Sequence, residues 1–117
     1  MLNVVTEYRK GILFVRLRGK LNKDTIYKLH RKVTKKVKEG GIRNIVFNVT
    51  NLKQIDIRGI NALLYNYDIC KKNDGISFIC GNNELINKNL KQSHLLNYIK
   101  EVSSELCAMK IIDMRVR

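Results

Sequence analysis

The sequence predicts an α/β fold with a mixed, mainly parallel sheet of four to five strands, an N-terminal hairpin and about four helices. Apolar residues alternate in residues 12–18 and recur every three or four positions in residues 22–40. Short apolar runs then alternate with further helical patterns. Strands that alternate with helices after a hairpin favour a mainly parallel sheet with helical crossovers. The absence of proline leaves every element uninterrupted.

The hairpin comes first along the chain. Residues 12–18 have the alternation of a half-buried strand. Its two faces carry Leu13, Val15 and Leu17 on one side, and Phe14, Arg16 and Arg18 on the other. A strand over residues 3–9 is expected to pair with it through the turn at Lys10 and Gly11.

A basic helix and a central strand are predicted next. Residues 22–40 predict an amphipathic helix, with Asn22 or Asp24 as its N-cap and Gly40 and Gly41 as its stop. Its apolar face is formed by Ile26, Leu29, Val33 and Val37. Residues 44–49 are short, β-branched and apolar on both sides, which is typical of a central strand covered on both faces.

The second half of the chain continues the alternation. After a loop at residues 50–55, a helix is expected over residues 57–73. Its buried face would carry Ile60, Leu63, Leu64, Tyr67 and Cys70. A buried strand follows at 76–81, a third helix at 83–96 and a short strand at 98–102. Ser103 is expected to cap a last helix that runs through residue 114.

Length and composition favour one domain over residues 1–117, since a chain of 117 residues with 44% hydrophobic residues can bury one core. No apolar run approaches the roughly 20 residues that span a bilayer, and the N-terminus lacks the pattern of a signal peptide. A cytoplasmic protein without membrane insertion is therefore expected. The three cysteines, Cys70, Cys80 and Cys107, have no metal-ligand or redox spacing and are interpreted as reduced thiols in or near the core.

The charge is high and unevenly distributed. The chain has 23 Lys and Arg against 10 Asp and Glu, a formal net charge of +13. Residues 1–44 hold 13 of these cations and three of the acids. A basic half can attract nucleic acid, an anionic lipid surface or an acidic protein, and it can equally be a solvated lysine-rich surface. Charge alone does not choose among them.

Motifs for catalysis and cofactor binding are missing from the sequence. Neither glycine-rich phosphate-binding fingerprint is present, and no serine has the context of a nucleophile elbow. His30 and His94 have no carboxylate or cysteine at ligand spacing, so no metal site is predicted. The tyrosines are scattered and form no RNA-binding signature. We expect no enzymatic activity, no catalytic residues and no cofactor, and nucleic acid remains a hypothesis based on charge alone.

Three stretches, in their order along the chain, carry a resemblance to a known family. They are "VRLRGKLNKDT" at 15–25, "IRNIVFNVTNLKQIDIRGINALL" at 42–64 and "NDGISFICG" at 73–81. Together with the order of elements they resemble the STAS domain, the fold of bacterial anti-sigma factor antagonists and of the cytosolic tails of sulphate transporters. The resemblance covers nearly the whole chain. It is nearest to the small antagonists of the sporulation and stress-response type.

The resemblance implies a protein-binding switch. In that family the unmodified antagonist binds an anti-sigma factor of the serine-kinase type and releases a sigma factor, and the kinase ends this by phosphorylating the second serine of a "D-S-S-G" or "D-S-T-G" motif. Here "DIRG" occupies that place, so Asp56 and Gly59 match, Ile57 replaces the first serine and Arg58 the phosphoacceptor. The upstream "G-x-L-D" turn reads "GKLN", which puts Asn22 in place of its carboxylate.

The family site maps onto two segments of this chain. The partner-binding residues that the resemblance implies are Asn22, Lys23, Asp24, Thr25, Asp56, Ile57, Arg58, Gly59 and Asn61. Because arginine has no hydroxyl, phosphorylation at the degenerate position 58 is not expected. Thr25 and Thr50 are hydroxyl-bearing residues expected near the same face.

Two alternatives to an antagonist of an anti-sigma factor stay open at this point. One is a STAS scaffold or accessory subunit of a signalling or lipid-transport complex, which binds a partner and does no chemistry. The other is a basic binder of nucleic acid or an anionic surface, whose affinity would fall steeply with salt.

Overall fold

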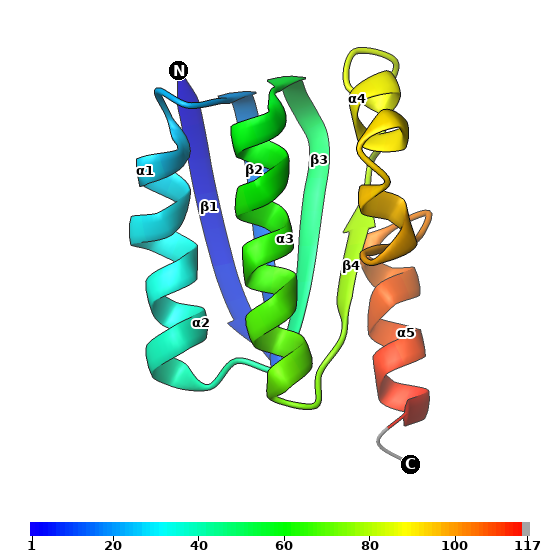
Figure 1. The fold of residues 1–117 in the computed structure, drawn as a ribbon. Coiled ribbons are helices and arrows are strands. Elements are labelled where there is room, and N and C mark those ends of the chain that lie inside the picture. The colour runs from blue at the N-terminus through cyan, green and yellow to red at the C-terminus, as the bar shows by residue number, and fades with distance from the viewer. Residues whose placement is uncertain (116–117) are drawn as a thin grey trace.

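A computed structural model describes residues 1–115 and places five strands in one sheet in the order β1-β2-β3-β4-β5 (Figure 1). The strands are β1 (Leu2–Arg9), β2 (Ile12–Leu21), β3 (Asn44–Ile55), β4 (Ser77–Cys80) and β5 (Lys100–Glu101). β1 pairs with β2 antiparallel, and the later pairs are parallel. The predicted mixed, mainly parallel sheet with an N-terminal hairpin is confirmed.

Four helical segments cover the sheet. The first is continuous through α1 (Ile26–Leu29), the π-helical turn η1 (His30–Thr34) and α2 (Lys35–Gly40). The others are α3 (Ile57–Lys72), α4 (Asn87–Gln92), which is followed by the short 3-10 helix η2 (Leu95–Asn97), and α5 (Glu105–Arg115). None of the helices in residues 1–115 is long and apolar enough to cross a membrane.

The sheet has an apolar core on each face. The larger core lies under α1–α2, α3 and α4, where Leu13, Val15 and Phe47 of the sheet are buried together with residues such as Val33 and Leu63 of the helices. The smaller core lies under α5 and is formed by Ile12, Phe14, Val46, Phe78, Cys80, Val102, Ala108 and Ile112. Successive apolar side chains of β2 therefore pack into different cores, because neighbouring residues of a strand point to opposite faces of the sheet.

Residues 50–55 were expected to form a loop, and this expectation was wrong. β3 continues through them to Ile55 and pairs with the last residues of β2, Gly19 with Leu52 and Leu21 with Ile55. Two register shifts in this pairing, which fit a β-bulge, let Leu52 and Ile55 both reach the core. The polar residues between Leu52 and Ile55 hid the strand pattern in the sequence. The strand is stabilised by backbone pairing with β2 and by the burial of these two side chains.

The helix starts also differ from the expectation. The first helix begins at Ile26, and neither Asn22 nor Asp24 caps it, because residues 22–25 form a turn of their own. In the last helix Ser104 and not Ser103 supplies the cap, since its Oγ accepts a hydrogen bond from the Cys107 N–H at 3.1 Å. The predicted third helix over 83–96 is reduced to α4 and η2, which are separated at His94 by a left-handed backbone conformation (φ 62°).

Candidate functional site

The turn at residues 22–25 is held by its own hydrogen bonds. The Asn22 N–H donates to Thr25 Oγ1 at 2.9 Å, and the Thr25 hydroxyl donates to the Lys20 carbonyl at 2.8 Å. The Asp24 N–H donates to Asn22 Oδ1, also at 2.9 Å. Thr25 is thereby buried, while Lys23 and Asp24 are exposed and Asn22 is half-buried. The turn presents a polar surface on a fixed backbone, and Thr25 is part of its framework.

Asp56 joins this turn to the start of α3. It is the N-cap residue of the helix, and its Oδ1 accepts from the Gly59 N–H at 2.9 Å. Its other oxygen, Oδ2, accepts from the Lys23 N–H at 3.1 Å. The Asp56 N–H itself donates to the Leu21 carbonyl at 3.2 Å. One carboxylate therefore holds residues 22–25 and the first turn of α3 side by side as a single surface.

Gly59 allows α3 to approach the end of β2 closely. A Cβ atom at this position would lie 2.6 Å from the Leu21 carbonyl oxygen and 2.9 Å from side-chain atoms of Leu21 and Ile55. Such contacts are too short for any side chain, so the helix start requires glycine here. Gly59 is buried and shapes the site without offering a side chain to a partner.

Arg58 and Ile57 are exposed on the first turn of α3. The Ile57 side chain is 62% exposed, which is high for a large apolar residue. The first turn contains no acidic residue, and no hydrogen bond or ion pair to Arg58 forms within residues 1–115. A cation is disfavoured here by the helix dipole, by a few tenths of a kcal/mol to about 1 kcal/mol, and the Asp56 carboxylate at the cap offsets part of this cost. Arg58 is thus free to bind an anion from outside.

A shallow hollow of about 300 Å³ lies beside this surface. Its lining residues are Asn22, Lys23, Asp24, Gln54, Ile55, Asp56 and Asn89. Four of them were predicted as site residues from the sequence, whereas Gln54, Ile55 and Asn89 were missed. Asn89 comes from α4, and its Nδ2 donates to the Ile55 carbonyl at 2.5 Å. No local pattern marks Asn89 as part of the site, because a contact 34 residues away along the chain places it there.

The predicted residues fall into three groups by exposure. Lys23, Asp24, Ile57, Arg58 and Asn61 are exposed, Asn22 and Asp56 are half-buried, and Thr25 and Gly59 are buried. The structure therefore brings the two predicted segments together, and it assigns Thr25 and Gly59 to packing.

The titratable groups with shifted pKa lie outside this surface. Burial raises the pKa of the Cys70 and Cys80 thiols to about 11, so both stay protonated at neutral pH. Hydrogen bonds to Glu105 raise the pKa of Arg16, and the same pair lowers the pKa of Glu105. The Arg16 guanidinium donates two bonds to Glu105, at 2.8 and 2.9 Å, which fastens α5 to the sheet. These groups therefore contribute to the stability of the fold.

Within residues 1–115, no three His, Cys, Asp or Glu side chains gather as metal ligands would.

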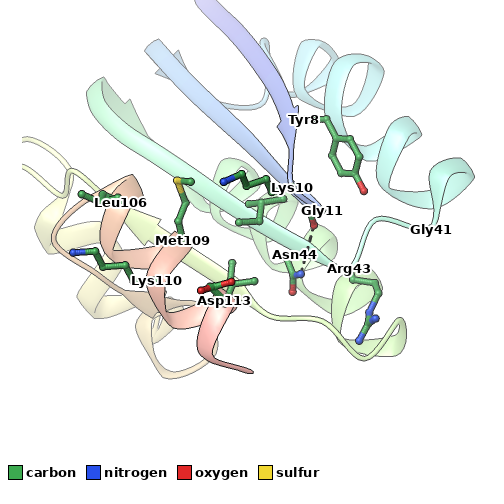
Figure 2. A pocket seen from close by; sticks show the side chains of 12 residues that line it. Tyr8, Lys10, Gly11, Gly41, Arg43, Asn44, Leu106, Met109, Lys110 and Asp113 are labelled. Atoms are coloured by element: carbon green, nitrogen blue, oxygen red, sulfur yellow. Dashed lines mark hydrogen bonds between the residues drawn. The ribbon is translucent and has the colours of Figure 1, made fainter. Parts of the chain in front are cut away.

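A second cavity, of about 560 Å³, lies at the opposite end of the sheet, where β2 and β3 begin and α5 ends. Figure 2 shows Lys10, Arg43 and Lys110 at separate places around it. Arg43 donates to the Asp74 carbonyl at 3.2 Å, and Asp113 also lines the cavity. The charges do not converge on one ligand, so the surface at residues 22–25 and 56–61 remains the stronger candidate.

Comparisons with known proteins agree with this architecture. The family model for the STAS domain matches residues 3–108. A protein of Paenibacillus polymyxa named anti-sigma F factor antagonist is 23% identical over 113 residues, which is 97% of each chain.

Two solved structures share the fold. A protein of Thermotoga maritima described as a candidate anti-sigma factor antagonist has a TM-score of 0.86 at 14% identity, over 94% of each chain. The Bacillus cell fate determinant SpoIIAA in its phosphorylated form has a TM-score of 0.71 at 20% identity, over 98% of this chain and all of that one.

Proposed function

The chain belongs to the STAS domain family, and from this premise we propose that it is a protein-binding regulator that binds an anti-sigma factor of the serine-kinase type and so releases a sigma factor. The relative named anti-sigma F factor antagonist, which matches along nearly its whole length, supports this choice. The chain would act by binding and would carry out no chemistry itself.

The observation that carries the proposal is the double hydrogen bond of Asp56. By accepting from both Lys23 and Gly59, this carboxylate makes one continuous surface of the two segments that the family uses for its partner. We propose the exposed and half-buried residues of that surface as the contact residues. They are Asn22, Lys23, Asp24, Asp56, Ile57, Arg58 and Asn61.

Arg58 gives the surface its chemical character. A guanidinium presents a planar fork of N–H donors that fits a carboxylate or phosphate group of a partner. Ile57 beside it supplies an apolar contact that loses its water on binding. We therefore expect the partner to place an acidic or phosphorylated group against the start of α3.

Control by phosphorylation would not operate at position 58 in this chain. Of the two hydroxyls considered from the sequence, Thr25 is buried and donates to the Lys20 carbonyl, so a kinase cannot reach it without opening the turn. Thr50 is exposed, and its Oγ1 donates to Asn48 Oδ1 at 2.6 Å. Thr50 is accordingly the hydroxyl of the two at which a relocated switch would act.

Affinity capture of the tagged chain from its own cells, followed by mass spectrometry, tests the proposed partner. We expect to recover an anti-sigma factor with a serine-kinase domain. Recovery of a transport ATPase or a permease would instead identify an accessory subunit. Release of bound nucleic acid with a steep salt dependence would identify a basic nucleic-acid binder.

The kinase recovered in this way also tests the assignment of position 58. Incubation with ATP should leave the wild-type chain unmodified and should phosphorylate the variant Arg58→Ser, since that variant restores a hydroxyl at the family position. Phosphorylation of wild type at Thr50 would show that the switch has moved. Failure of Arg58→Ser to accept phosphate, while binding is retained, would contradict the assignment.

A further inference from the structure

Three lysines on the first helix reach across to the outer edge of the sheet. Lys28 Nζ donates to the Leu2 carbonyl at 3.2 Å, and Lys32 Nζ donates to the Val4 carbonyl at 3.3 Å. Lys36 Nζ donates to Thr6 Oγ1 at 3.0 Å. The three bonds form a row in which each step of four residues along the helix matches a step of two residues along β1.

The spacing of this row has a geometric cause. Four residues of helix advance about 6 Å, and two residues of an antiparallel strand advance about 6.8 Å. Figure 1 shows the helix through α1 and α2 running alongside β1 in the same direction. Lysines at every fourth position therefore stay in step with alternate residues of the strand.

The atoms that these lysines meet belong to an open strand edge. β1 is the outermost strand and pairs only with β2. The Met1 carbonyl accepts from the Lys20 N–H, so odd-numbered residues of β1 bond toward β2. In an antiparallel pair the alternate residues point their N–H and C=O groups outward. The even positions 2, 4, 6 and 8 thus form a free edge, which is the usual template for pairing with another strand.

We propose that the row Lys28, Lys32 and Lys36 closes the β1 edge against strand pairing with a second copy of this chain. The ammonium groups occupy two outward carbonyls and place three positive charges along the edge, where an incoming strand would have to displace and desolvate them. This assigns part of the basic charge of residues 1–44 to keeping the sheet edge unpaired, a role separate from the partner surface at α3.

A second copy is the occupant that the edge fits best. In the antiparallel register that uses all four outward positions, residue 5 faces its own counterpart and residue 3 faces residue 7. Val5, which is 48% exposed, would then pack against Val5, and Glu7 would face Asn3, so no like charges oppose each other. Without proline and with β-branched residues at positions 4, 5 and 6, the strand is well suited to such pairing.

Self-association of the full chain, measured by light scattering after size exclusion, tests the proposal. The variant Lys28→Gln/Lys32→Gln/Lys36→Gln removes the row. The variant Arg31→Gln/Lys35→Gln/Lys38→Gln is the matched control, because it removes three charges from the same helix and none of the bonds to β1. We expect wild type and the control to have the monomer mass of 13.6 kDa and the row variant to have twice that mass at the same concentration.

A further substitution in the row variant locates the contact. Val5→Glu places two carboxylates opposite each other across the two-fold register and should return the row variant to the monomer mass. If the triple variant fails to fold, as judged by circular dichroism, the single variant Lys32→Gln at the centre of the row should still associate measurably more than wild type.

Several outcomes overturn the proposal. A row variant that folds and stays monomeric would show that the lysines do not guard the edge. Dimerisation of the control to the same extent would show that loss of charge alone drives association. A wild-type chain that is already dimeric through β1, with slowed hydrogen exchange at its even-numbered amides, would show that the edge is not closed.

Discussion

The carboxylate of Asp56 accepts a hydrogen bond from the backbone of Lys23, 33 residues earlier in the chain, at 3.1 Å. The same side chain caps α3 through the Gly59 N–H. The N-cap residue of α3 is therefore also the link between two segments of the candidate surface. This double role makes the geometry of the surface depend on one side chain.

Replacing Asp56 should cost stability in proportion to both bonds. Loss of an N-cap costs about 1 kcal/mol, and the Lys23 bond is exposed and adds less than that. Asp56→Ala should therefore lower the free energy of unfolding by about 1 to 2 kcal/mol in urea denaturation. Asp24→Ala, on the same turn and exposed, is the control and should change it by less than about 0.5 kcal/mol. Equal effects of the two variants would show that Asp56 is not the link.

Gly59→Ala should be more damaging than an ordinary glycine substitution in a helix. The added methyl group would meet the Leu21 carbonyl at 2.6 Å, so α3 would have to move away from β2 at a cost of about 1 to 3 kcal/mol. Gly40→Ala is the matched control, since its Cβ would meet only the Ile42 side chain at 3.9 Å and alanine favours the helix. Thermal unfolding should show a lower Tm for Gly59→Ala and an unchanged or higher Tm for Gly40→Ala. A Gly59→Ala variant as stable as wild type would contradict the packing account.

The order of elements could be predicted from the sequence because it depends on local periodicity. Residues with strand alternation and residues with helical spacing both place their apolar side chains on one face of their element. The structure buries these side chains in the larger core, for example Leu13, Val15 and Leu17 of β2 and Leu29 and Val33 of the first helix. The STAS family could be predicted from this order of strands and helices together with the motif at Asp56 and Gly59, and the family model confirms it.

The departures arise where distant residues decide the local structure. β3 extends past residue 49 because the end of β2 offers it a partner, and Asn83 Nδ2 donates to the Leu52 carbonyl at 3.0 Å. The same holds at the candidate site, where Asn89 reaches the surface through a bond to the Ile55 carbonyl. Contacts between residues far apart in the chain produce no periodic pattern in the sequence. Neither the extension of β3 nor the place of Asn89 at the site could therefore be predicted.

Acidification should weaken the attachment of α5. Hydrogen bonds from Arg16 lower the pKa of Glu105 below its ordinary value of 4.5, so the charged carboxylate stabilises the fold above that pH. This contribution is lost as pH falls through the lowered pKa, because the folded chain must then take up the proton.

The variant Glu105→Gln measures this contribution. At pH 7 it should lower the free energy of unfolding by about 1 kcal/mol, a modest amount because the pair is partly exposed. The difference from wild type should shrink as pH falls below 4.5. Glu39→Gln, at an exposed position on α2, removes one carboxylate outside this pair and is the control for the change in charge at pH 7. A gap between wild type and Glu105→Gln that stays constant down to acid pH would contradict the assignment.

We propose that the start of α3 is the partner surface and that Arg58 contributes to it. The dissociation constant of the captured anti-sigma factor, measured by titration calorimetry for wild type, Arg58→Ala and the control Arg31→Ala, tests it most directly. Arg58 is exposed and makes no bond within residues 1–115, so its removal should leave folding intact. We predict that Arg58→Ala raises the dissociation constant about tenfold or more, as expected for a contact worth more than about 1 kcal/mol. Arg31→Ala should leave it unchanged. Equal dissociation constants for wild type and Arg58→Ala would show that Arg58 takes no part in partner binding.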